Sequence, residues 1–162
     1  MVINELKDKE QTLKNFFNAM KELREQGILI NNKDFTSQIG EWLVEMIFEG
    51  KRADSGIQKG WDIDVKGKHI QVKTHAKAET NKSRFSVVNK ESAEEIDELI
   101  IVVFTSDYKL KSFYKVPWGV ASPLIILRGK KSQKNIINWS SIKKYKIAIE
   151  ELPHQEIVSL FL

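Results

Sequence analysis

The chain contains no cysteine and only three prolines among its 162 residues. The absence of cysteine excludes a disulfide framework and any metal site with thiolate ligands. No apolar run approaches the roughly 20 residues that are needed to cross a bilayer. The first residues also lack the basic and then apolar layout of a signal peptide. We therefore expect a cytoplasmic protein that does not associate with membranes.

Internal repeats, low-complexity tracts and linkers rich in proline or serine are absent as well. A length of 162 residues and a hydrophobic content of 41% therefore predict a single domain, residues 1–162, with a core of its own. The net charge is +4 and the isoelectric point is about 9.1. This modest positive excess is compatible with a polyanionic partner but is shared by many unrelated proteins.

Hydrophobic periodicity predicts two helices at the start of the chain, over residues 4–26 and 34–49, each followed by a glycine. The run from Leu99 to Phe104 is continuously apolar and rich in β-branched residues, which favours a central strand buried on both faces. We further expect a hairpin at 61–75, a loop to residue 84, strands at 85–88, 109–116 and 145–149, and helical segments at 91–96, 139–143 and 153–162. This order predicts an α/β fold in which a mixed central β-sheet is flanked by helices.

The most informative segment is the predicted hairpin, which has a two-residue turn at Lys66-Gly67. In this register Ile63 faces Ile70, and Asp62 faces Gln71. Because side chains alternate along a strand, Ile63, Ile70 and Val72 share one face, while Asp62, Asp64, His69, Gln71 and Lys73 share the other. A carboxylate, an amide and a lysine side by side on one face are costly to arrange without a ligand, which suggests a metal-assisted active site.

Hydrolysis of a phosphodiester requires an activated water and stabilisation of a highly negative transition state, and a divalent metal serves both needs. Mg²⁺ prefers oxygen ligands and needs only one or two carboxylates from the protein. Asp62 offers a carboxylate, Gln71 an amide oxygen and Val72 a backbone carbonyl. The Lys73 ammonium could orient the attacking water or offset the charge of the phosphate.

Asp62, followed after a hairpin by Gln71-Val72-Lys73 and preceded by a glutamate-bearing helix, resembles the PD-(D/E)XK nucleases. This superfamily includes restriction endonucleases, Holliday junction resolvases and Mrr-type enzymes, and the resemblance covers roughly residues 36–116. It implies a restriction-endonuclease-like core in which Asp62 and Gln71 bind the metal and Lys73 assists the nucleophile. The helix glutamate, acting through water, would be Glu41 or Glu45, and the Gly-Glu pair at 40–41 favours Glu41.

The chain departs from the family pattern at two positions. Residue 61 is tryptophan where the motif has proline, and residue 71 is glutamine where it has an acidic residue. Glutamine at this position recurs in Mrr-type enzymes. The substitution removes one negative charge, so metal binding should weaken, but an oxygen ligand remains. Asp64 is an accessory acid or a solvated partner of His69.

The resemblance implies a Mg²⁺-dependent DNA endonuclease, with Mn²⁺ able to substitute, and we expect a small type II restriction-type enzyme with a companion methyltransferase. Residues 34–116 would form the catalytic core, and residues 117–162 would complete the sheet and its flanking helices. Cutting both strands of a duplex most simply needs a homodimer, and residues 1–30 carry a helix that could contact the second copy or DNA. The basic residues after the hairpin would lie near the phosphate backbone: Lys77, Lys82, Arg84 and Lys90.

Several other interpretations stay open at the level of sequence. The protein could be a structure-specific repair or resolvase-type nuclease, or a non-catalytic nucleic-acid-binding module on the same fold. Asp62 and Lys73 could form an ordinary surface ion pair, which would be worth only about 0–1 kcal/mol. His69 and His75 could join the two aspartates in a zinc site, and the lysine-rich loop could be a solubilising surface.

Overall fold

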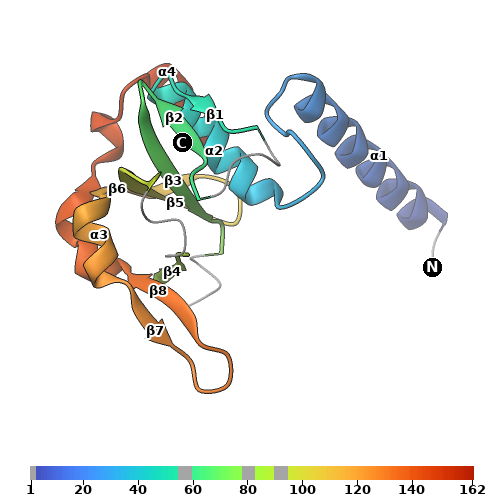
Figure 1. The fold of residues 1–162 in the computed structure, drawn as a ribbon. Helices are drawn as coiled ribbons and strands as arrows, with labels where there is room; N and C mark the ends of the chain where they lie inside the picture. The colour runs from blue at the N-terminus through green and yellow to red at the C-terminus, as the bar shows by residue number, and fades with distance from the viewer. Residues whose placement is uncertain (1–2, 55–59, 78–82, 90–94) are drawn as a thin grey trace.

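The computed structural model describes residues 3–54, 60–77, 83–89 and 95–162. Two β-sheets and several helices make up this part of the chain (Figure 1). The larger sheet has six strands in the order β1-β2-β3-β5-β6-β9, and the smaller has three in the order β4-β8-β7. β3 and β5 run parallel, whereas the other neighbouring strands are antiparallel. The prediction of an α/β fold with a mixed central sheet is confirmed.

The central sheet is built on three long strands, with short strands toward its edges. The long strands are β3 (Lys68–His75), β5 (Glu98–Phe104) and β6 (Leu110–Pro117), and the short ones are β1 (Lys51–Arg52), β2 (Ile63–Val65) and β9 (Lys146–Ile147). The smaller sheet consists of β4 (Phe85–Val87), β7 (Ile126–Arg128) and β8 (Lys134–Asn138). The strands predicted at 99–104 and 109–116 are therefore confirmed as β5 and β6.

Two long helices precede the sheets, and short helical turns follow them. α1 spans Ile3–Glu25, and α2 spans Phe35–Ile47 with Asp34 as its N-cap. α3 (Trp118–Leu124) and α4 (Gln155–Val158) are short, and 3₁₀ turns cover Trp139–Tyr145, Ile149–Glu151 and Ser159–Phe161. In Figure 1, α2 lies against the central sheet, whereas α1 extends away from both sheets.

The core consists of two hydrophobic clusters, one on each face of β5. Residues 99–104 are all at most 1% exposed, which confirms the prediction of a strand buried on both faces. Ile100, Val102 and Phe104 contribute to the cluster that includes Leu43, Val44 and Ile47 of α2. Leu99, Ile101 and Val103 contribute to the cluster that includes Trp118, Ile137 and Trp139.

Some predicted elements need correction. The segment predicted as a helix at 139–143 is a 3₁₀ segment with a non-helical residue at Ile142. The helix predicted at 153–162 is a single α-turn followed by a 3₁₀ turn, and the strand predicted at 145–149 has two residues. β1, α3, β7 and β8 were not expected from the sequence. The helix predicted at 91–96 lies mostly outside the described residues.

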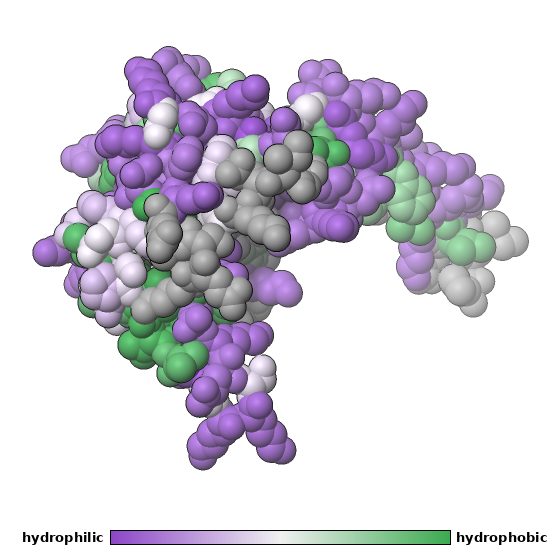
Figure 2. Space-filling view, viewed as in Figure 1, coloured by the Kyte–Doolittle hydropathy of each residue, from purple (hydrophilic) through white to green (hydrophobic). Residues whose placement is uncertain are grey.

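α1 leaves large apolar side chains in contact with solvent. Leu6, Leu13, Phe16 and Phe17 are each more than half exposed. Figure 2 shows green side chains on this helix among hydrophilic ones. Within the described residues, no helix combines the length and the apolar character that crossing a bilayer would require.

Candidate active site

The hairpin has the predicted register from its turn to Ile63, but the ladder ends there and does not include the predicted pairing of Asp62 with Gln71. Ile63 pairs with Ile70, and Asp64 pairs with His69. The turn residues Lys66 and Gly67 both have positive φ, at 52° and 85°, as a two-residue hairpin turn requires. Ile63, Ile70 and Val72 share the apolar face, as predicted, and they belong to the cluster that contains α2.

Asp62 lies immediately before β2 and is anchored to β3 at both its backbone and its side chain. Its N–H donates to the Ile70 carbonyl at 2.8 Å, and its Oδ2 accepts the Val72 N–H at 2.7 Å. Burial raises the pKa of the Asp62 carboxyl, and the Val72 N–H and the Lys73 ammonium partly oppose this rise. The carboxylate is thus held against β3, just before the first residue of β2.

Glu41 reaches the same region from α2. The preceding residue, Gly40, lies so close to β3 that a β-carbon there would come within 2.8 Å of the Cγ2 and Cβ atoms of Thr74. This close approach places the Glu41 carboxyl in the electric field of Asp62 and Lys73. Burial and then the Asp62 charge raise the pKa of Glu41 to about 7 from an ordinary value of 4.5, against a smaller lowering effect of Lys73.

Gln71 and Lys73 lie on the face of β3 opposite to Ile70 and Val72. Gln71 is only 6% exposed, and its Oε1 is buried with no hydrogen-bond partner among the described residues. Such an oxygen normally has a partner, so Gln71 presents an unused ligand atom. The Lys73 charge lowers the pKa values of Glu41, Asp62 and His75, which shows that its ammonium acts on all three groups.

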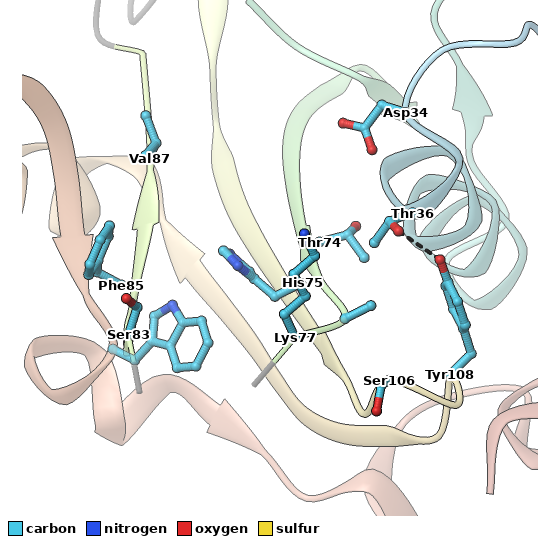
Figure 3. Close-up of a pocket in the computed structure, with 12 residues that line it drawn as sticks. Asp34, Thr36, Thr74, His75, Lys77, Ser83, Phe85, Val87, Ser106 and Tyr108 are labelled. Carbon is cyan, nitrogen blue, oxygen red and sulfur yellow. Dashed lines mark hydrogen bonds between the residues drawn. The ribbon is translucent and has the colours of Figure 1, made fainter. Parts of the chain in front are cut away.

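Two cavities lie in this part of the molecule. Glu41 and Asp62 line a cavity of about 320 Å³, and His75 and Lys77 line a neighbouring cavity of about 600 Å³ (Figure 3). Asp34 lines both. The cavity that holds the two carboxylates therefore shares one wall residue with the larger cavity.

The remaining predicted site residues have other surroundings. Glu45 accepts the Arg52 backbone N–H at 3.0 Å and the Arg52 Nε–H at 2.8 Å, so it fastens β1 to α2. Asp64 accepts the Gly67 N–H at 3.0 Å and supports the turn. Neither has a described contact with Glu41 or Asp62, and neither is brought into the site.

The basic residues predicted to bind nucleic acid divide into two groups. Lys77 lines the larger cavity, and Arg84 directly precedes β4 and donates to the Ser83 carbonyl at 3.0 Å. Lys82 and Lys90 lie outside the described residues. The structure therefore places Lys77 in the wall of the larger cavity and not in the cavity of the two carboxylates.

Two features of these cavities were not predicted. Asp34 caps α2 by accepting the Ser37 N–H at 3.1 Å, and its charge contributes to the raised pKa of Glu41. Helical spacing from Asp34 to Glu41 would have been the signal for this pair. The second feature is a network in which Ser86 Oγ lies 2.8 Å from His75 Nε2 and accepts the Trp139 Nε1–H at 3.0 Å. Long-range packing creates this network, and no local pattern predicts it.

The donor set suits a hard cation better than zinc. His69 stacks on Trp61 at 4.3 Å and contacts the Glu95 carbonyl, whereas His75 contacts Ser86, so the two histidines have separate environments. Among the described residues, no group of three or more histidine, aspartate or glutamate side chains is placed to hold a metal ion. What the site offers is two carboxylates and the Gln71 amide oxygen, and Mg²⁺ takes oxygen ligands of this kind while keeping several waters.

No protein-family model matches the chain, and no curated protein matches it. The chemistry of the site is therefore inferred from its geometry. Glu41 and Asp62 line the same cavity, the charges of Asp62 and Lys73 act on the Glu41 carboxyl, and the buried Gln71 oxygen has no described partner.

Proposed function

We propose that the chain is a Mg²⁺-dependent DNA endonuclease with a restriction-endonuclease-like core. The observation that carries the proposal is that two largely buried carboxyls, Glu41 and Asp62, line one cavity. Burial raises the pKa of both, the Asp62 charge raises the pKa of Glu41 further, and the Lys73 charge opposes both shifts. Buried like charges destabilise a fold unless a ligand compensates for them. A cation is the ligand that would do so.

The residues present fit Mg²⁺. Asp62 and Gln71 would hold the ion, and Glu41 would act on it through water. The Val72 carbonyl would face the same edge as the Val72 N–H that Asp62 accepts, because both groups of one residue point to the same side of a strand. A bound Mg²⁺ would act as a Lewis acid that lowers the pKa of water and stabilises charge on a phosphate.

The chain's own groups would then have distinct tasks. Lys73 would hold its ammonium near the non-bridging phosphate oxygens and offset the charge that grows on them during attack. Glu41 has a pKa of about 7, so its carboxyl can accept or release a proton near neutral pH. The hydrogen bond from the Val72 N–H would hold the Asp62 carboxylate in place while Glu41 changes charge.

The substrate we propose is duplex DNA, cut by a homodimer of a type II restriction-type enzyme. α1 supports the dimer, because its apolar residues recur at the a and d positions of a heptad: Leu6, Leu13, Phe16, Met20 and Leu23. Leu6, Leu13 and Phe16 are more than half exposed. A second α1 would cover this stripe by coiled-coil packing, and a twofold dimer would present one site to each DNA strand.

The proposal is tested by incubating the protein with supercoiled plasmid in Mg²⁺ or EDTA. We expect nicked and linear DNA only with Mg²⁺, and a rate at least about 10²-fold lower for Lys73→Ala, because a group that stabilises developing charge has an effect of this size. Lys68→Ala is the matched control, since Lys68 lies at the exposed start of the same strand. Unchanged cleavage by Lys73→Ala would refute the site.

The same assay separates the related functions. Preferential cutting of a four-way junction over plasmid would indicate a resolvase-type enzyme. DNA binding with no cleavage in Mg²⁺ or Mn²⁺ would indicate a non-catalytic module and would contradict the proposal.

A further inference from the structure

The hairpin formed by β7, its turn and β8 (residues 126–138), here called the arm, projects from the body of the protein. Figure 1 shows it extending beyond the central sheet, and Figure 2 shows hydrophilic side chains covering its tip. Every residue from Ile126 to Lys134 is exposed. Ile136 and Ile137 of β8 are buried and anchor the base of the arm, whereas the part from Ile126 to Lys134 adds little to the core and is free to contact a partner.

Charge is distributed very unevenly around the arm. From Tyr108 to Ile149 the chain has ten lysine and arginine residues and no aspartate or glutamate, which leaves an acidic excess in the rest of a chain with 26 basic and 22 acidic residues. Four of the ten lie on the arm: Arg128, Lys130, Lys131 and Lys134. No ion pair within the described part of the chain includes any of these four.

The register of the arm makes this concentration of charge unfavourable for the isolated protein. Arg128 pairs directly across the hairpin with Lys134, and like charges directly opposite each other destabilise a sheet. Lys130 and Lys131 follow within the turn. A polyanion is the partner that would convert this repulsion into attraction.

The arm also adjoins the larger cavity, which shares Asp34 with the cavity of the candidate site. β8 pairs with β4, so that Asn138 lies opposite Phe85 and Ile136 lies opposite Val87. Phe85 and Val87 line the larger cavity (Figure 3), and the Arg128 guanidinium stands 5.1 Å from the centre of the Phe85 ring. The arm is therefore attached, through β4, to a wall of the larger cavity.

We propose that the arm is a DNA-binding element that enters the major groove of duplex DNA and contacts its phosphates through Lys130, Lys131 and Lys134. A two-stranded β-ribbon fits the major groove of B-form DNA, whereas the deep, narrow major groove of duplex RNA does not admit one. The proposal deepens the proposed function and rests on it for the identity of the ligand. It assigns substrate affinity to residues outside the carboxylate site.

The test measures binding of a fluorescent 30-base-pair DNA duplex by anisotropy in EDTA, over a series of KCl concentrations. The arm variant is Lys130→Gln/Lys131→Gln/Lys134→Gln, which leaves Arg128 on Phe85. The control is Lys51→Gln/Lys66→Gln/Lys68→Gln, which removes three charges near the β2–β3 turn, at the end of β3 remote from the larger cavity.

Each phosphate contact contributes about −0.9 to the slope of log K against log salt concentration. We expect the slope for the arm variant to be less negative by about 1 to 2.7 and its Kd to rise about tenfold or more, while the control keeps the wild-type slope. Equal slopes for the arm variant and the wild type would overturn the proposal. An equal effect of the arm substitutions on duplex RNA would overturn the assignment to DNA.

Lys134→Glu gives a second readout. It places opposite charges across the arm, so we expect a melting temperature about 1 to 4 °C higher together with weaker DNA binding. A variant that is more stable but binds DNA unchanged would contradict the proposal.

The arm and the catalytic proposal can fail separately. If the arm variant cleaves plasmid and binds DNA normally, the proposal for the arm is refuted, but the proposed nuclease activity stands. If DNA binding depends on the arm but no cleavage is found, the proposal for the arm stands and the proposed nuclease activity is refuted.

Discussion

Glu41→Gln tests whether ionisation of the Glu41 carboxyl destabilises the folded protein. The folded protein raises the pKa of Glu41 from 4.5 to about 7, so between these pH values the folded chain keeps a proton that the unfolded chain releases. The free energy of unfolding therefore falls as the pH rises through this window. One pKa unit corresponds to about 1.4 kcal/mol, which gives a loss of about 3 kcal/mol above pH 7.

Glutamine is nearly isosteric with the protonated carboxyl and does not ionise. In EDTA at pH 8 we therefore expect Glu41→Gln to raise the free energy of unfolding by up to about 3 kcal/mol, or the melting temperature by about 6 to 12 °C. At pH 4.5 the two proteins should have nearly equal stability. Urea unfolding at pH values from 4.5 to 8 measures the difference directly.

Mg²⁺ should reverse the order of the two proteins. The wild type should gain stability as Mg²⁺ is added at pH 8, because an ion that binds only the folded state stabilises it, and Glu41→Gln should gain less and lose cleavage activity. Glu45→Gln is the control, because Glu45 lies one turn along α2 and holds Arg52 at 2.8 Å. It should lower stability instead. Parallel pH profiles for the wild type and Glu41→Gln would refute the reasoning.

Two further predictions concern packing and assembly. Gly40→Ala should lower the free energy of unfolding by about 1 to 3 kcal/mol, because its β-carbon would overlap Thr74 in a packed region. The control is Gly119→Ala, whose β-carbon meets nothing within 4 Å and should not lower the melting temperature. Equal melting temperatures for the two variants would contradict the close α2–β3 contact. Leu13→Lys/Phe16→Lys should convert a dimer into a monomer in sedimentation equilibrium, since both side chains are more than half exposed on α1, with Lys14→Gln on the neighbouring face as the control. If the wild type is monomeric at every concentration tested, the proposal that α1 forms a dimer is refuted.

The hairpin could be predicted in detail because its information is local. A two-residue turn fixes the register of both strands, and alternation then assigns every side chain to a face. The pairing of Ile63 with Ile70 and the burial of 99–104 follow from such short-range patterns. Asp62 illustrates the limit of the method, because it lies one residue before β2 and turns its carboxylate to the Val72 N–H rather than extending the ladder.

Elements that depend on distant parts of the chain could not be predicted. β8 pairs with β4, which lies about fifty residues earlier in the sequence. β7 and β8 are short and are separated by a lysine-rich turn, so their alternating pattern is too brief to indicate strands. The preference for Glu41 over Glu45 was drawn from its Gly-Glu context. The physical distinction lies in tertiary contacts, because Arg52 engages Glu45 whereas Gly40 brings Glu41 beside Asp62.

Three features of the protein are energetically unfavourable, each for a different physical reason and in a different part of the fold. The Glu41–Asp62 pair concentrates negative charge in a cavity, the Arg128–Lys134 pair concentrates positive charge on the arm, and α1 exposes an apolar stripe. Natural folds keep such costs where function requires them. A cation, a polyanion and a second copy of the chain would relieve them in turn. Substitutions that stabilise the free protein at these three places should therefore weaken binding of the corresponding partner, which a purely structural role would not predict.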